Sequence, residues 1–300
     1  MASQAETLSE FLRVRRAKLD PARFGYPLHN RRVPGLRREE LADLAGISSE
    51  YYVRIEQGRD HRMSIQVLSS LARALDLDDE QRSYFFRLAL PSPAPEASRG
   101  TPQPVSDTVL ALLRGNSSEP VYVFDSNQDI IAITEMADLL LPWLADWDDN
   151  IVLATFGVSD RLHESDNWQR IARSTVAALR FHGDPEHPRL QQIVGELSVS
   201  NAHFRRMWAD HDARPLTEGF ASMPIEGVGS VDFPKINLET PDGFFLTGWP
   251  ADPGTPAHDA LEHLLSSRLT GRPVRGPLAG YPSRVTSVVA TSRMAATMLG

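Results

Sequence analysis

The chain has 300 residues, of which 41% are hydrophobic and 23% charged, and its formal net charge is −8. This composition is that of a globular protein long enough for two domains, and no apolar run reaches the ~18 residues of a membrane-spanning helix. The absence of cysteine excludes disulfides, thiolate catalysis and cysteine-ligated zinc.

The first distinctive segment, 36–58 (LRREELADLAGISSEYYVRIEQG), reads as two short helices joined by a turn. Its apolar residues recur at helical spacing, Gly46 suits a turn with positive φ, and Ser48 is a suitable N-cap for the second helix. One helical pattern precedes this segment and two follow it, so we predict a five-helix module over residues 1–90. An ordinary pair of packed helices is the alternative to a DNA-binding helix–turn–helix.

Two further stretches favour the DNA-binding reading. Residues 55–58 (IEQG) and 64–78 (SIQVLSSLARALDLD) resemble the Cro/repressor-type (XRE) helix–turn–helix family. The resemblance implies that the second helix enters the major groove of DNA.

Residues 1–90 hold 15 basic and 13 acidic residues, whereas residues 91–300 hold 16 basic and 26 acidic residues. The acidic character therefore lies in the second part of the chain, away from the expected DNA surface.

We expect the start of the second helix to face base edges. Arg54 suits guanine and Glu50 suits the amino group of cytosine, although a carboxylate at a helix N-terminus is also favoured by the helix dipole. The arginine-rich loop 29–35 either lies along the DNA or is a solvated loop, and Arg38 and Arg59 are expected at phosphates. The candidate DNA-binding residues are Arg31, Arg32, Arg37, Arg38, Ser48, Ser49, Glu50, Tyr51, Arg54 and Arg59.

Residues 91–104 (PSPAPEASRGTPQP) contain five prolines and read as a semi-rigid linker. The second domain, residues 105–265, alternates strand-like and helical patterns. Strands are expected at 121–124, 130–134, 223–225, 228–233 and 244–249, and helices near 109–113, 135–147, 165–182, 188–198, 200–211 and from 256. The whole chain is therefore expected to be mainly α, with an α+β C-terminal domain whose antiparallel sheet is covered by helices.

A series of short motifs in this order resembles the MmyB-type transcriptional regulators. The motifs are 31–48 (RRVPGLRREELADLAGIS), 51–52 (YY), 55–59 (IEQGR), 167–170 (NWQR), 179–180 (LR), 194–198 (VGELS), 204–212 (FRRMWADHD) and 252–255 (DPGT). The resemblance covers roughly residues 8–265 and implies an XRE domain joined to a PAS-like domain that senses a small apolar molecule such as a fatty acid. The chain departs from the family at 133–134 and 225–226, where the family usually carries Trp-Asn and His-Pro.

The five tryptophans all lie in the second domain and favour an apolar pocket, although core packing is the alternative for most of them. Arginine or histidine side chains would hold the carboxylate of an acidic ligand. The candidate ligand-binding residues are Trp143, Trp168, Arg170, Phe204, Arg205, Trp208 and His211.

We find no catalytic motif, no metal-ligand spacing and no cofactor fingerprint in the sequence, and expect no enzymatic activity. The expected partners are double-stranded DNA, a small apolar or fatty-acid-like effector, and a second copy in a homodimer. The alternative is a second domain that serves protein interaction or dimerisation without a small-molecule ligand. Residues 266–300 are expected to form a basic, flexible tail. With no signal peptide or membrane segment, we expect a cytoplasmic protein associated with the nucleoid.

Overall fold

A computed structural model gives the structure of the chain and describes residues 3–29, 31–59, 63–90, 105–115, 118–157, 163 and 165–269. The chain divides into two compact units. The first unit comprises Met1–Gln103 and Val176–Leu216, and the second comprises Pro104–Thr175 and Thr217–Gly300. The proline-rich linker, 91–104, and the part of the tail from residue 270 onward lie outside the described residues.

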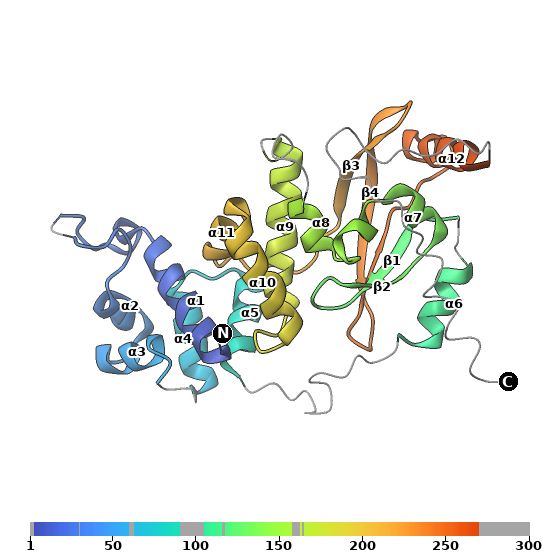
Figure 1. Cartoon of the computed structure of the whole chain (residues 1–300). Helices are drawn as coiled ribbons and strands as arrows, with labels where there is room; N and C mark the ends of the chain where they lie inside the picture. The colour runs from blue at the N-terminus through green and yellow to red at the C-terminus, as the bar shows by residue number, and fades with distance from the viewer. Residues whose placement is uncertain are drawn as a thin grey trace. The chain divides into compact units, whose positions relative to one another are not determined.

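The first unit begins with the expected helical module (Figure 1). Its elements are α1 (Gln4–Lys18), the short 3-10 helix η1 (Pro21–Phe24), α2 (Arg38–Ala45), α3 (Ser49–Glu56), α4 (Ile65–Ala74) and α5 (Asp79–Ala89). The side chains of Ser3, Ser48 and Ser64 accept hydrogen bonds from backbone amides at the start of α1, α3 and α4. These caps satisfy amides that would otherwise lack partners. The prediction of five helices is confirmed.

A closely packed core holds these helices together. The ring of Phe11 on α1 lies 5.5 Å from that of Tyr84 and 6.0 Å from that of Phe85, both on α5. Tyr52 and Ile55 of α3 are fully buried in the same core. Burying side chains of this size stabilises the module by about 1.5–3 kcal/mol each.

A segment far along the chain completes the first unit. It contains the end of α9 (Asp166–His182) and the helices α10 (Pro188–Ser200) and α11 (Ala202–Ala209). Ala213 is fully buried in the core of the helical module, and the ring of Phe181 stacks 6.1 Å from that of Tyr84. This segment lies within the predicted second domain, 105–265, and in the structure it packs on α1 and α5 (Figure 1).

The second unit is built on a five-stranded antiparallel sheet of order β2-β1-β5-β4-β3. Its strands are β1 (Val121–Phe124), β2 (Ile130–Ile133), β3 (Gly219–Ile225), β4 (Gly229–Glu239) and β5 (Phe245–Gly248). The strands β1 and β2 pair as the expected hairpin, and β5 pairs with β1 on its other side. The expected PAS-like sheet with flanking helices is confirmed.

Helices flank this sheet (Figure 1). They are α6 (Asp107–Gly115), α7 (Glu135–Leu140), the 3-10 helix η3 (Leu144–Trp147), α8 (Ile151–Gly157), the start of α9, and α12 (Pro256–Leu269). Leu113 of α6 packs with Val123 and Leu246 on one face of the sheet. Since side chains alternate along a strand, the neighbouring residues Phe124 and Phe245 point to the other face, where their rings lie 5.6 Å apart. No helix of the described part of the chain is long and apolar enough to cross a membrane.

Candidate DNA interface and ligand pocket

The turn between α2 and α3 fixes the direction of the second helix. Gly46 adopts a left-handed backbone with φ 67°, which costs little only for glycine. The amide of Ile47 then donates to the carbonyl of Ala42 at 3.0 Å. The hydroxyl of Ser48 accepts from the amide of Tyr51 at 3.1 Å and begins α3. Both predicted roles, Gly46 in the turn and Ser48 as the N-cap, are found in the structure.

Helix α3 has one buried side and one exposed side. Tyr52 and Ile55 are fully buried, whereas Glu50 and Arg54 are exposed one turn apart. Ser49 and Tyr51 are half-buried. The residues expected to read bases therefore share the side of α3 that the rest of the unit leaves accessible.

A buried ion pair fixes the C-terminal end of α3. The Arg16 guanidinium donates to Glu56 from Nε at 2.8 Å and from Nη2 at 3.0 Å, and Arg38 donates to the same carboxylate at 2.8 Å. Burial alone would raise the pKa of Glu56, but the hydrogen bonds and positive charge of Arg16, with a further hydrogen bond from Arg38, outweigh it and lower that pKa. This network was not predicted, because its only sequence signal is a charged residue on an otherwise apolar helix face.

Arg31 holds the loop before α2 rather than standing free at the surface. Its side chain is 6% exposed and forms a double hydrogen bond with the buried carboxylate of Glu40. It also donates to the carbonyls of Pro27 at 2.8 Å and Gly35 at 3.0 Å. A guanidinium used in this way positions the loop. Among the other candidate arginines, Arg32, Arg38 and Arg59 are exposed and Arg37 is half-buried.

Four candidate ligand residues lie in the first unit. Phe204 is fully buried with its ring stacked 5.7 Å from that of Trp208. Arg205 is exposed and donates to the carbonyl of Ser198 at 2.8 Å. His211 is 6% exposed, and its Nδ1 lies 3.3 Å from Nη1 of Arg180. Of the four, His211 contacts the helical module, since its Nε2 lies 3.4 Å from the carboxylate of Glu10 on α1.

The other three candidates lie in the second unit. Trp168 is buried, donates from Nε1 to the carbonyl of Thr155 at 2.8 Å and meets the ring of Phe156 edge-on. Arg170 is exposed and donates to Asn167 at 2.8 Å, and Trp143 is half-buried. The seven candidates are thus divided between the two units.

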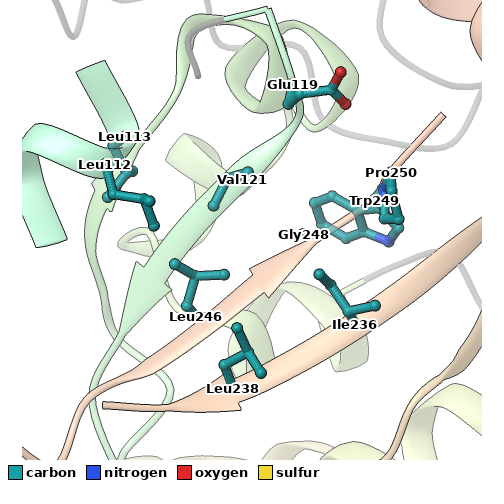
Figure 2. A pocket seen from close by; sticks show the side chains of 10 residues that line it. All are labelled: Leu112, Leu113, Glu119, Val121, Ile236, Leu238, Leu246, Gly248, Trp249 and Pro250. Carbon is teal, nitrogen blue, oxygen red and sulfur yellow. The ribbon is translucent and has the colours of Figure 1, made fainter. Parts of the chain in front are cut away.

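A pocket of about 230 Å³ lies in the second unit between α6 and the sheet (Figure 2). It is lined by Leu112, Leu113, Glu119, Val121, Ile236, Leu238, Leu246, Gly248, Trp249 and Pro250. None of these residues was among the seven candidate ligand-binding residues, although Trp249 is one of the five tryptophans that favoured an apolar pocket. Alternating apolar residues on β1, β4 and β5 are the usual signal of a sheet core, so sequence alone gives no reason to expect a hollow there.

Among the residues that the structure describes, no three histidine, aspartate or glutamate side chains gather into a group that could hold a metal ion. The candidate sites of the described chain are thus a helix–turn–helix with an accessible second helix and a PAS-like sheet with an apolar pocket. Together these define a DNA-binding regulator with a ligand-binding domain.

Comparison with protein families identifies the group. Residues 105–265, more than half of the chain, match the MmyB-like transcription regulator ligand binding domain, and residues 7–85 match a helix-turn-helix domain. The chain belongs to the MmyB-like transcription regulators. The resemblance seen in the sequence is confirmed. A comparison with curated proteins finds no match.

Proposed function

We propose that this regulator binds a specific duplex through α3 and that an effector in its second domain changes that binding. The exposed pair Glu50 and Arg54 on α3 supports specific base contacts. The exposed arginines Arg32, Arg38 and Arg59 support phosphate contacts, which fix the position of the protein on DNA. We assign it no catalytic role and, from the DNA partner alone, infer that it acts in the cytoplasm at the nucleoid.

One observation carries the coupling. Residues 176–216 belong to the stretch that matches the ligand-binding family, yet they pack on the helix–turn–helix module. Arg15 and Lys18 of α1 donate to the backbone carbonyls of His211 at 3.3 Å and Asp210 at 2.7 Å. An effector acts on DNA affinity only if it binds the DNA-bound and free states differently. Because α9 begins in the second unit and ends in the first, a change in the second unit has a covalent route to this segment, which packs on the module.

The family resemblance favours a small apolar effector, and a fatty acid is the class it implies. We further propose a homodimer, because the α3 helices of two copies would read half-sites ~34–36 Å apart. An effector would then need only to change the distance between the two α3 helices. Neither proposal depends on the other, since sedimentation and ligand binding measure them separately.

The test begins with selection of binding sites from random duplexes. The selected operator is then titrated with the protein at fixed salt, with and without a panel of fatty acids, alcohols and amines of equal length. We expect one selected sequence family and an effector that changes operator affinity by at least fivefold. Binding with no sequence preference would contradict the proposal. A panel with no effect on affinity would leave DNA binding intact and favour a second domain that binds protein.

A further inference from the structure

One face of the sheet in the second unit is covered by α6 over only part of its width. Leu113 of α6 packs with Val123 of β1 and Leu246 of β5. Beyond β5 the same face continues onto β4, where Leu238 is the register partner of Leu246 and therefore shares its face. Leu238 is 55% exposed. The part of the face that α6 leaves uncovered is therefore apolar and open to solvent.

Four exposed apolar side chains form this uncovered surface, which we call the open apolar face. They are Leu112 of α6, Ile236 and Leu238 of β4, and Phe220 of β3, whose register partner Pro234 shares a face with Ile236. Three of them, Leu112, Ile236 and Leu238, also line the pocket, so the pocket opens on this face (Figure 2). An exposed apolar patch of this kind is typical of a binding surface.

The charge of the second unit limits what can bind this face. Residues 105–175 and 217–269 hold 20 acidic and 6 basic residues, a net charge of −14. Asp232 lies on the same face of β4 as Ile236, because side chains alternate along a strand. A second copy of so acidic a unit would be repelled. The open apolar face therefore favours an apolar partner that carries positive charge.

The end of the same chain has this composition. Residues 270–300 hold four arginines and no acidic residue, and the stretch 284–293 (RVTSVVATSR) has three valines between two arginines. Helix α12 ends at Leu269, and the 14 residues from 270 to 283 can span up to about 45–50 Å. A domain of this size has a radius of gyration of about 14 Å, so the stretch can reach any side of the second unit. The covalent link also gives it a high effective concentration there.

We propose that residues 284–293 of this chain bind across the open apolar face. The valines contact the apolar side chains of Phe220, Ile236 and Leu238, and the arginines lie in the negative field of the second unit. The bound segment covers the side on which the pocket opens, so an effector has to displace it. This competition rests on the proposed function, whereas the binding of the segment does not. The proposed homodimer then uses another surface.

Disulfide trapping tests the position of the segment in the full chain. The chain has no cysteine, so a pair of introduced cysteines forms a single defined disulfide. We expect Leu238→Cys with Val288→Cys to form an intramolecular disulfide in glutathione buffer with an effective concentration at least tenfold above that of Val228→Cys with Val288→Cys. Val228 is the matched control, since it is 47% exposed and follows Glu226, whose carbonyl lies 3.0 Å from Nε2 of His263 on α12. Random collisions of the segment that follows α12 should therefore reach it readily.

Two results of this experiment would overturn the proposal. Equal effective concentrations for the two cysteine pairs would show that residues 284–293 have no preference for the open apolar face. A disulfide that joins two chains of the Leu238→Cys single variant as readily as the paired variant closes within one chain would show that a second copy covers the face. Leu238 is largely exposed, so its replacement by cysteine leaves the core intact.

Charge reversal tests the choice of segment. Arg284→Glu with Arg293→Glu, added to the trapping pair at 238 and 288, should lower the effective concentration at least fivefold. Arg272→Glu with Arg275→Glu makes the same change of charge nearer to α12 and should lower it less than twofold. Equal effects of the two double variants would overturn the assignment to residues 284–293.

A neutral fluorescent probe tests whether the segment covers the pocket. N-phenyl-1-naphthylamine should bind at least tenfold more weakly to the disulfide form of the trapping pair than to its reduced form. Unchanged probe binding would overturn the covering role. Operator titration separates this inference from the proposed function. If the disulfide forms as expected but no effector changes operator affinity, the bound segment stands and the sensor role fails. If an effector changes operator affinity while the disulfide shows no preference, the regulator stands and this inference fails.

Discussion

His211 presents its Nδ1 atom to the guanidinium of Arg180, with 3.3 Å between Nδ1 and Nη1. A guanidinium only donates hydrogen bonds, so Nδ1 must be the unprotonated acceptor. The proton of the neutral ring then lies on Nε2, 3.4 Å from the carboxylate of Glu10. Burial, followed by the charge of Arg180, lowers the pKa of His211 to about 3. The ring is therefore a neutral bridge between α9 and α1.

This bridge predicts a loss of stability in mild acid. Below pH 6.5 the unfolded chain protonates this histidine, whereas the folded chain does so only near pH 3, so stability falls as the pH falls. Burial and the charge of Arg87 also lower the pKa of His182, to about 4. Each histidine should add a slope approaching about 1.4 kcal/mol per pH unit to the unfolding free energy plotted against pH. This slope corresponds to the uptake of about one proton on unfolding.

Urea unfolding between pH 5 and 6.5 measures this slope. His211→Asn should remove about half of it, and asparagine tolerates the left-handed backbone at this position, where φ is 49°. His29→Asn, on an exposed residue, is the matched control. An identical slope in wild type and His211→Asn would show that the ring is protonated in the folded chain.

Glu56→Gln should destabilise the helical module by about 3–5 kcal/mol, because it leaves the buried Arg16 without its charged partner. Glu39→Gln should cost only about 0–1 kcal/mol, since Glu39 is 68% exposed. Because Arg16 and Arg38 hold the pKa of Glu56 below its ordinary value of 4.5, its stabilisation is complete above that value and is lost as the pH falls below it. Equal costs for the two variants in urea unfolding would refute the buried-pair role.

Arg54→Ala should weaken binding to the selected operator by about 1–3 kcal/mol and relax preference at one base pair. Arg82→Ala, an exposed arginine on α5 outside the helix–turn–helix pair, serves as the control and should change little. Mobility-shift titration at fixed salt compares the two. Unchanged operator affinity in Arg54→Ala would mean that α3 is not the helix that reads bases.

The sequence predicted those elements in which the local signals agree. The turn at Gly46, the cap at Ser48 and the apolar face of α3 all indicate the same helix pair, and the structure has it. The run 151–157 (IVLATFG) was not expected to form a helix. It is nearly all apolar, so its periodicity does not separate a buried strand from the buried helix α8 that forms. Strand β4 extends to Glu239 beyond its expected end at 233, because it pairs with β3 as far as Lys235 and with β5 from Ile236 to Glu239.

The candidate sites were less predictable, because they depend on contacts between distant residues. The pairing of Arg31 with Glu40 spans a loop of irregular structure, and that of Arg16 with Glu56 joins two helices 40 residues apart. Residue type alone gave Arg31 the same weight as the exposed arginines. The assignment of Ala213 to the core of the helical module likewise has no local signal.

The last prediction concerns what holds residues 176–216 on the helical module. Arg214 donates to Glu80 at 2.7 Å and to Asp78 at 3.0 Å, but its side chain is 41% exposed. Ala213, one residue before it, is fully buried in the module's core. Exposed ion pairs contribute about 0–1 kcal/mol, whereas overpacking a close-packed site costs about 1–3 kcal/mol.

Ala213→Leu should therefore destabilise the first unit more than Arg214→Ala, and should increase hydrogen exchange of the α5 amides that face this segment. Urea unfolding compares the two variants, and added salt should reduce only the cost of Arg214→Ala, because screening acts on exposed charges. A larger cost for Arg214→Ala would mean that the contact is mainly electrostatic. In that case salt would weaken the attachment of this segment as well as the phosphate contacts, and both effects would alter DNA affinity. The salt dependence of operator binding would then differ between Arg214→Ala and the wild type.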